Sequence, residues 1–351
     1  MLLLLSGVLN AAGNQFEAQL QKVMSRNEFR HATFGIQFYS LDAKKPLFSM
    51  NADKFFVPAS TTKLITSGSA LSILGADYRF HTRIYRTGEI KDGTLDGDLI
   101  LVASGDPNLS GRVTDQDTLL FEDEDHSYGG EDSRGVGKDP LLVIRKLAKQ
   151  VSDQKIKKIN GRIIVDASLF PQGDRELGTD VMISPIVVND NVVDVVVSPG
   201  NAENAPAIIK VAPETSYVRF INKATTAKSD SDHDLRWDSD VENSDGSRTV
   251  TLGGTVPAGG KPYMFSYAVP DPTRYAEVVL TEALRDVGVS GNPRLKEERL
   301  DFKSLASSYT SANQIAEHIS PPLTEEIKVI LKVSQNLHAS MMPYLFSALI
   351  A

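Results

Sequence analysis

The hydrophobic pattern of this 351-residue chain changes from helical to strand-like and back, and this order limits the folds that it can adopt. A helix is expected from Ser60 to Gly75, where the glycine can serve as a left-handed cap. Short strands with glycine-rich turns follow from Phe80 to Val102. Helical spacing returns after Asp271. We therefore expect an α/β (α+β) fold, in which one α/β domain is split by a β-rich insertion.

Other segments fit this plan. Apolar spacing predicts a helix from Phe16 to Met24, and alternation predicts strands at Thr33–Leu41 and Pro46–Met50 that pair as a hairpin. Further helices are expected at residues 139–152 and 323–333, and further strands at 161–166, 187–197 and 249–252. The polar segment from Lys223 to Gly246, with its Ser-Asp repeats, is expected to be an exposed or poorly ordered loop. These elements place the α/β domain at residues 14–75 and 269–351, and the insertion, with two subdomains, at 76–268.

The composition excludes several classes of protein. The net charge of −8, the estimated pI of 5.4 and the lack of a basic run argue against a general affinity for nucleic acid. The chain has no cysteine, which excludes disulfides, zinc-thiolate sites and cysteine nucleophiles. We expect no cofactor.

The N-terminus resembles a secretory leader that lacks its basic start. Residues 1–13 are an apolar stretch followed by small residues, and the first basic residue is Lys22. A buried first helix is the alternative. No later stretch reaches the roughly 18 uninterrupted apolar residues of a spanning helix, so we expect an exported protein that is soluble or peripheral at the membrane.

An acidic segment runs from Phe121 to Asp132 and contains His126. It could hold a metal ion, but acidic loops of this kind are usually solvated. We expect a solvated loop and no metal.

Ser60 is the best candidate for a nucleophile. Lys63 follows three residues later and returns to the same helix face. A serine hydroxyl needs a base to take its proton, and a lysine can be that base where burial lowers its pKa. The helix N-terminus adds N–H groups that favour an oxyanion. No HExxH zinc motif, GxSxG nucleophile elbow or phosphate loop competes, and none of the six histidines sits in a recognisable Ser-His-Asp motif.

Such a site also needs a second hydroxyl and an amide, and Ser334 and Asn336 supply them. Each pattern is weak alone. A helix-capping serine with a surface lysine would fit Ser60 equally, and Ser152 with Lys155 repeats the same spacing. Ser-x-Asn also begins at residues 25, 49, 290 and 311. Position after the expected helix at 323–333 favours Ser334.

The order of these motifs resembles a known family, the class C low-molecular-mass penicillin-binding proteins of the D-Ala-D-Ala carboxypeptidase/endopeptidase type (serine peptidase family S13). The resemblance covers nearly the whole chain, and its motifs in order are Pro58-Ala-Ser-Thr-Thr-Lys63, Gly97-Asp-Leu-Ile-Leu101, Ser104-Gly-Asp-Pro107, Gly161-Arg-Ile-Ile-Val-Asp166, Asn189-Asp-Asn191, Gly253 to Pro257 and Ser334-Gln-Asn336.

The resemblance implies a serine-type hydrolase outside the cytoplasm that cleaves the terminal D-Ala of peptidoglycan stem peptides, or their cross-links, through an acyl-serine that β-lactams also form. It implies that Ser60 is the nucleophile, Lys63 its base and Ser334 the proton relay. Asn336 would hold substrate, and Asp166 resembles a residue that lines the family's substrate cleft. A homodimer is left open.

The chain departs from the family pattern most clearly at the third motif. It contains no Lys-Thr-Gly or Lys-Ser-Gly triplet, and the nearest match, Arg86-Thr-Gly88, lies in an expected hairpin turn. Gln335 stands where the family usually has Asp, and Ser340 stands where an acidic residue often follows Ala. The missing strand would supply a lysine for the substrate carboxylate and one oxyanion donor, whose loss typically costs about 10²–10³ in rate. We therefore expect a C-terminally truncated member with impaired hydrolysis. The alternative is a non-catalytic envelope module that binds peptidoglycan or a partner.

Overall fold

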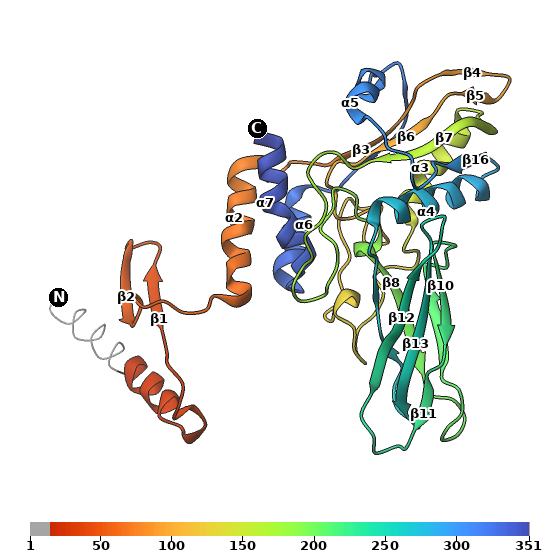
Figure 1. Ribbon diagram of the computed structural model, residues 1–351. Coiled ribbons are helices and arrows are strands. Elements are labelled where there is room, and N and C mark those ends of the chain that lie inside the picture. The colour runs from red at the N-terminus through yellow and green to blue at the C-terminus, as the bar shows by residue number, and fades with distance from the viewer. Residues whose placement is uncertain (1–14, 351) are drawn as a thin grey trace. The chain divides into compact units, whose positions relative to one another are not determined.

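The computed structural model describes residues 15–350 (Figure 1). The leader expected at residues 1–13 lies outside this range. The chain forms two compact units, Met1–Ala59 and Ser60–Ala351. Each is described by itself below.

The first unit is built on a hairpin. Residues 15–24 are helical, a short 3₁₀ turn η1 (Asn27–Phe29) follows, and β1 (Ile36–Ser40) pairs antiparallel with β2 (Lys45–Met50). The ring of Phe16 packs edge-on against Phe38 and Phe48, with centroids 4.9 and 6.1 Å apart. The expected helix and hairpin are confirmed.

The first helix of the second unit shares an apolar core with the last two helices of the chain. The 3₁₀ turn η2 (Ala59–Thr61) leads into α2 (Thr62–Leu74), and α2 packs against α6 (Leu323–Lys332) and α7 (Asn336–Ile350). Their buried core includes Ala70, Ile327, Ile330, Leu337, Met341 and Leu345. Gly75 ends α2 with a φ of 89° and a ψ of 155°. The positive φ is as expected, but the ψ lies outside the left-handed helical region, so the expected left-handed cap is wrong. The Gly75 carbonyl instead accepts a hydrogen bond from the Tyr78 amide.

A seven-stranded mixed sheet forms the centre of the second unit. Its strands are β3 (His81–Arg86), β4 (Glu89–Lys91), β5 (Thr94–Asp96), β6 (Leu99–Val102), β7 (Lys158–Asp166), β16 (Ser290–Pro293) and β17 (Gln314–Ile319). The order is β17-β3-β6-β7-β5-β4, and β16 also pairs with β7. The sheet takes strands from both sides of residue 268, where the sequence suggested a domain boundary. The sharing of a sheet does not by itself define domains, and the boundary stays a prediction.

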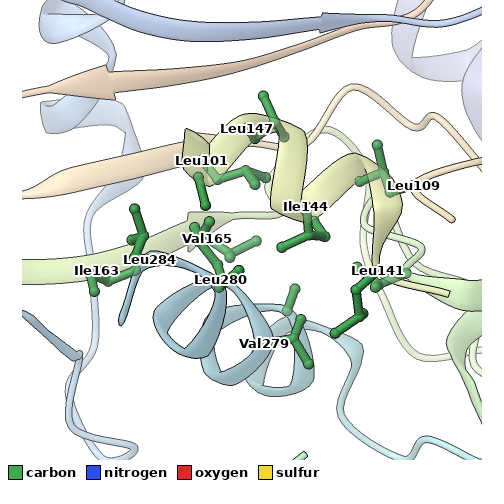
Figure 2. Packing of buried hydrophobic residues seen from close by; sticks show 14 of the residues in the cluster. Leu101, Leu109, Leu141, Ile144, Leu147, Ile163, Val165, Val279, Leu280 and Leu284 are labelled. Carbon is green, nitrogen blue, oxygen red and sulfur yellow. The ribbon is translucent and has the colours of Figure 1, made fainter. Parts of the chain in front are cut away.

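Two helices bury the apolar side chains of this sheet. They are α3 (Leu142–Asp153) and α4 (Pro272–Asp286), and they pack against each other and against the sheet. Figure 2 shows Leu101, Ile163 and Val165 of the strands in one cluster with helix residues such as Ile144 and Leu280. Asp271 caps α4 by accepting a hydrogen bond from the Arg274 amide, as the Asp-Pro signal favours. The two expected helices are confirmed.

Two four-stranded sheets form the rest of the second unit. In one sheet, β8 (Val192–Ser198) pairs antiparallel with each of β9 (Ile208–Ala212), β14 (Tyr263–Met264) and β15 (Tyr267–Ala268). The other contains β10 (Val218–Asn222), β11 (Thr225–Ala227), β12 (Asp234–Glu242) and β13 (Arg248–Pro257). Buried Val195, Val197, Leu252 and Val256 join the two sheets in one core. Short elements elsewhere are η3 (His126–Tyr128), η4 (Asn189–Asn191), α5 (Phe302–Leu305) and η5 (Ala306–Ser308).

The expectation of a loop from Lys223 to Gly246 is wrong, because β12 and β11 lie within it. β12 pairs antiparallel with β13. Its partly buried Leu235 and Trp237 alternate with exposed charged residues, and the Trp237 ring stacks on Phe265 at a centroid distance of 4.6 Å. The polar residues occupy the solvent face of a half-buried strand, which composition alone does not distinguish from a loop.

Over the described residues, none of the helices combines the length and apolar character that crossing a bilayer demands.

Leu280→Ala tests the core between α3, α4 and the sheet. Leu280 is fully buried, so truncation removes apolar contacts and leaves a cavity. We expect the free energy of unfolding to fall by about 2–5 kcal/mol, measured by circular dichroism in urea. Leu295→Ala is the matched control, because Leu295 is 74% exposed and its truncation should change stability by less than about 0.5 kcal/mol. Equal effects of the two substitutions would contradict this assignment of the core.

Candidate active site

Four of the five predicted site residues lie together in the second unit. Lys63 Nζ donates to Ser60 Oγ at 3.0 Å, and Ser334 Oγ donates to the same Ser60 oxygen at 2.9 Å. Lys63 Nζ also donates to Asn336 Oδ1. The Ser60 hydroxyl is therefore hydrogen-bonded to the Lys63 amine and to the Ser334 hydroxyl, and the Lys63 amine is hydrogen-bonded to the Asn336 side-chain amide.

Local structure explains how these side chains meet. Ser60 lies in η2 and Lys63 lies in the first turn of α2, so the two face the same side one turn apart. Ser334 lies between α6 and α7, and Asn336 is the first residue of α7. Because both helices pack against α2, the loop between them meets its N-terminal end.

Lys63 is a buried residue. It is 7% exposed as a whole, and burial lowers the pKa of Lys63 below its ordinary value, while the negative charge of Glu176 opposes this shift. Burial disfavours the charged ammonium form. The Lys63 amine therefore loses its proton more readily than an exposed lysine does.

A loop that the sequence did not single out also borders the site. The buried carboxylate of Glu176 accepts hydrogen bonds from the amides of Gly178 and Thr179, both at 2.8 Å. This arrangement brings Gly178 so close to Asn336 that a Cβ at Gly178 would lie 2.5 Å from Asn336 Nδ2. A lone glycine in a polar loop gave no signal for this contact.

Asp166 is the fifth candidate, and its hydrogen-bond partners differ from those of the other four. It ends β7, and its carboxylate accepts hydrogen bonds from the Tyr309 hydroxyl at 2.6 Å and the Ser168 amide at 2.9 Å. Among the described residues, none of its hydrogen bonds reaches Ser60, Lys63, Ser334 or Asn336. Its role at the site stays a prediction.

The expectation that the acidic segment at 121–132 is entirely solvated is wrong. Asp125 and His126 are each 1% exposed. The Arg112 guanidinium, which is fully buried, pairs with Asp125 at 2.5 Å and also with Asp190. Buried charges persist where they are paired and hydrogen-bonded, and here the compensating cation comes from outside the segment.

Two buried histidines complete this cluster. His126 lies between Asp190 and Asp194, with both nitrogen-oxygen distances 2.8 Å. His338 lies between Asp190 and Glu326, at 3.0 and 2.9 Å. Burial opposes protonation of both rings, but the adjacent carboxylates outweigh it: the pKa of His126 is raised well above its ordinary value and that of His338 to about 9.

Asp125, His126 and Asp190 have the donor types and the proximity of a metal site. However, Arg112 already lies between the two carboxylates, and both nitrogens of His126 already face carboxylates. Because a guanidinium supplies the positive charge here, we assign no metal to this cluster.

Asp190, the central carboxylate of the cluster, lies in a turn with unusual backbone angles. Asn189, Asp190 and Asn191 have φ values of 49°, 53° and 52°, which is left-handed backbone at three successive non-glycine residues. The single strand expected at Val187–Val197 is therefore wrong in its first half, because η4 interrupts it and β8 begins only at Val192. The side chain of Asn191 holds the turn by accepting from the Val188 amide and donating to the Ile186 carbonyl.

Gln335 connects this cluster to the candidate site. It lies between Ser334 and Asn336, is fully buried, and its Nε2 donates to Asp125 Oδ1 at 2.9 Å and to Ser127 Oγ at 3.1 Å. An amide can donate to Asp125, whereas a second carboxylate would repel it. This explains why Gln is suited to a position where the family resemblance led us to expect Asp.

Comparison with known proteins identifies the family that this chain matches. A family model described as "D-Ala-D-Ala carboxypeptidase 3 (S13) family" matches residues 16–345. The chain is 25% identical over 332 residues to a D-alanyl-D-alanine carboxypeptidase of Actinomadura sp., with 89% of this chain and 53% of that protein covered. It is 27% identical over 295 residues to the D-alanyl-D-alanine carboxypeptidase DacB of Haemophilus influenzae, with 82% and 53% covered. The chain thus spans about half the length of these curated relatives.

Solved structures show the same fold. Penicillin-binding protein 4 (dacB) from Haemophilus influenzae matches with a TM-score of 0.66 and 22% identity, over 89% of this chain and 62% of that one. The same protein complexed with a β-lactam matches with a TM-score of 0.62 and 21% identity, over 89% and 60%. The predicted fold class is confirmed.

His338 predicts how stability depends on pH. Its pKa is higher in the folded chain, about 9, than the ordinary value of 6.5, so folding binds a proton. The stability that it contributes is fully present below pH 6.5 and is lost as the pH rises through 9. This change corresponds to on the order of 3 kcal/mol, and urea unfolding at pH 6 and pH 9.5 should detect it. His338→Gln should be less stable at pH 6 and lose much of this pH dependence. His31→Gln, at an exposed position, should keep it. An unchanged profile in His338→Gln would show that this histidine does not carry the effect.

Proposed function

The chain belongs to the D-Ala-D-Ala carboxypeptidase 3 (S13) family, and we propose that it acts as a serine-type carboxypeptidase on peptidoglycan stem peptides that end in D-Ala-D-Ala. The observation that carries the proposal is the hydrogen-bonded group of Ser60, Lys63, Ser334 and Asn336. Its geometry and the family membership point to the same reaction class.

In the proposed mechanism, the neutral Lys63 amine takes the proton of Ser60, 3.0 Å away, as the serine oxygen attacks the carbonyl of the scissile peptide bond. Ser334, bonded to the same oxygen, relays the proton toward the leaving D-Ala amine. The bond between Ser60 and the acyl group forms while the peptide C–N bond breaks. Water then hydrolyses the acyl-serine and regenerates the hydroxyl.

Asn336 has two tasks in this proposal. Its side-chain carbonyl accepts from Lys63 and so fixes the amine beside Ser60, and its amide nitrogen can donate to the substrate backbone. A β-lactam would enter by the same attack and remain as the acyl-serine. Because peptidoglycan lies outside the cytoplasm, we propose that the protein acts there. We also propose that Asp166 contacts the substrate.

A second candidate function is a non-catalytic envelope module that binds peptidoglycan. The observation that favours it is that this 351-residue sequence holds no Lys-Thr-Gly or Lys-Ser-Gly triplet, the third motif that the family resemblance leads us to expect. Assays of D-Ala release and of binding to cell-wall sacculi separate the two. Release of D-Ala by this chain excludes the second function, and binding without release or acylation favours it.

Ser60→Ala tests the proposed nucleophile. With no hydroxyl there is no acyl acceptor, so labelling by a fluorescent penicillin should fall roughly 10⁴-fold or more, to background. Labelling is measured after denaturing electrophoresis, and peptide mass spectrometry locates the adduct. Ser152→Ala is the matched control, because Ser152 has a lysine at the same spacing but donates to the Val287 carbonyl. Equal labelling of the Ser60→Ala protein and the unmodified chain would refute the assignment.

Gly178→Ala tests the position of Asn336. The new Cβ would lie 2.5 Å from the side-chain nitrogen Nδ2 of Asn336, so the Asn336 side chain must move away. We expect acylation to slow by about 10- to 100-fold, since small displacements of a positioning group have effects of this size, while the fold is retained. Gly68→Ala, on α2 with nothing within 4 Å of the added Cβ, is the control and should acylate normally. Unchanged acylation in Gly178→Ala would mean that the Asn336 position is not limiting.

A further inference from the structure

Tyr128 holds the loop that carries two of the site residues. It is the last residue of η3, and its hydroxyl donates to the Ser334 carbonyl oxygen at 2.6 Å. The same hydroxyl oxygen accepts from the Asn336 backbone amide at 3.1 Å. One phenol therefore bonds to peptide groups on both sides of Gln335, and it comes from a segment more than two hundred residues earlier in the chain.

The loop has two features that need such a partner. Ser334 has a φ of 60°, a left-handed conformation that costs free energy for a residue with a side chain. Asn336 begins α7, and the first amides of a helix have no acceptor within the helix. The Tyr128 hydroxyl supplies that acceptor and restrains the carbonyl of the strained residue.

Tyr128 can act as a restraint because the turn that bears it is itself fixed. His126 of this turn lies between two carboxylates, and its backbone carbonyl accepts from Ser266 Oγ at 2.6 Å. Asp125 caps the turn by accepting from the Ser127 amide at 3.0 Å. The buried charge cluster thus holds one side of the loop through Gln335 and the other through Tyr128.

We propose that Tyr128 is a positioning residue, which sets the Ser334 hydroxyl and the Asn336 side chain against Ser60 and Lys63 through its hydroxyl bonds to the backbone of the 334–336 loop. This proposal rests on the proposed function, because it assigns Tyr128 to the same acylation reaction. The phenol acts on the loop and not on the reacting atoms, since its hydrogen bonds to Ser334 and Asn336 go to the loop backbone.

Tyr128→Phe removes the hydroxyl and keeps the ring, and two measurements read the result in the full chain. The first is hydrogen exchange by mass spectrometry, in which the peptide containing residues 334–337 should exchange at least about tenfold faster because the Asn336 amide loses its acceptor. The second is penicillin acylation kinetics, in which the rate constant at saturation should fall about tenfold or more while the half-saturating concentration stays within about twofold.

The matched control is Tyr267→Phe. It removes a phenol hydroxyl from the same unit, one that donates to Asp240 at 2.8 Å on the β-rich sheets. Exchange at residues 334–337 and acylation should both match those of the unmodified chain. If Tyr128→Phe instead speeds exchange throughout the chain, its role is general stability and the proposal is overturned.

The two measurements keep this inference separate from the proposed function. If the unmodified chain is not acylated, the function fails, and local exchange still decides whether Tyr128 holds the loop. Unchanged exchange at 334–337 in Tyr128→Phe overturns the inference even where acylation occurs. Faster local exchange with an unchanged acylation rate also overturns it, because the loop would then move without affecting the reaction.

Discussion

The carboxylate of Asp190 is the point on which much of the second unit depends. Three basic side chains converge on it, those of Arg112, His126 and His338, and all four residues are buried. Removing so many charges from water is costly, and the cost is recovered only when every partner is in place. Burial opposes ionisation of Asp190, but Arg112 and the histidines outweigh it and hold its pKa well below its ordinary value. The cluster therefore joins chain segments that lie far apart in the sequence.

This coupling explains how the candidate site is assembled from distant parts of the sequence. Ser60 and Lys63 come from one helix start, and their proximity needs only local geometry. Ser334 and Asn336 must be brought to them by the loop between α6 and α7. That loop is fixed on its buried side by Gln335 bonded to Asp125, and α7 is fixed by His338 bonded to Asp190. The residues that hold the loop thus belong to the charged segments at 112–128 and 189–194.

The sequence predicted the parts of this structure in which the signal is local. The spacing of Ser60 and Lys63, the Asp271 cap and the hairpin of the first unit all follow from neighbouring residues. The buried turn around His126 could not be predicted in this way, because its acidic residues look solvated until Arg112 is placed against them. Gly178 and Tyr128 gave no signal either, since their importance comes from contacts with Asn336 and not from their neighbours in sequence. The strand β12 was missed for a different reason. A strand with one face in solvent has polar or charged residues at every second position, so its composition resembles that of a loop.

The aromatic packing on the β-rich sheets has a practical consequence. The chain contains one tryptophan, Trp237, and it stacks on Phe265 and lies near Phe220 and Tyr267, within the core that the two four-stranded sheets share. Indole emission therefore comes from a single known position, away from the helices that carry the serine and the lysine. Emission intensity reports on this aromatic core, and far-ultraviolet dichroism reports mainly on the helices. Following both signals during denaturation shows whether these regions lose their structure together.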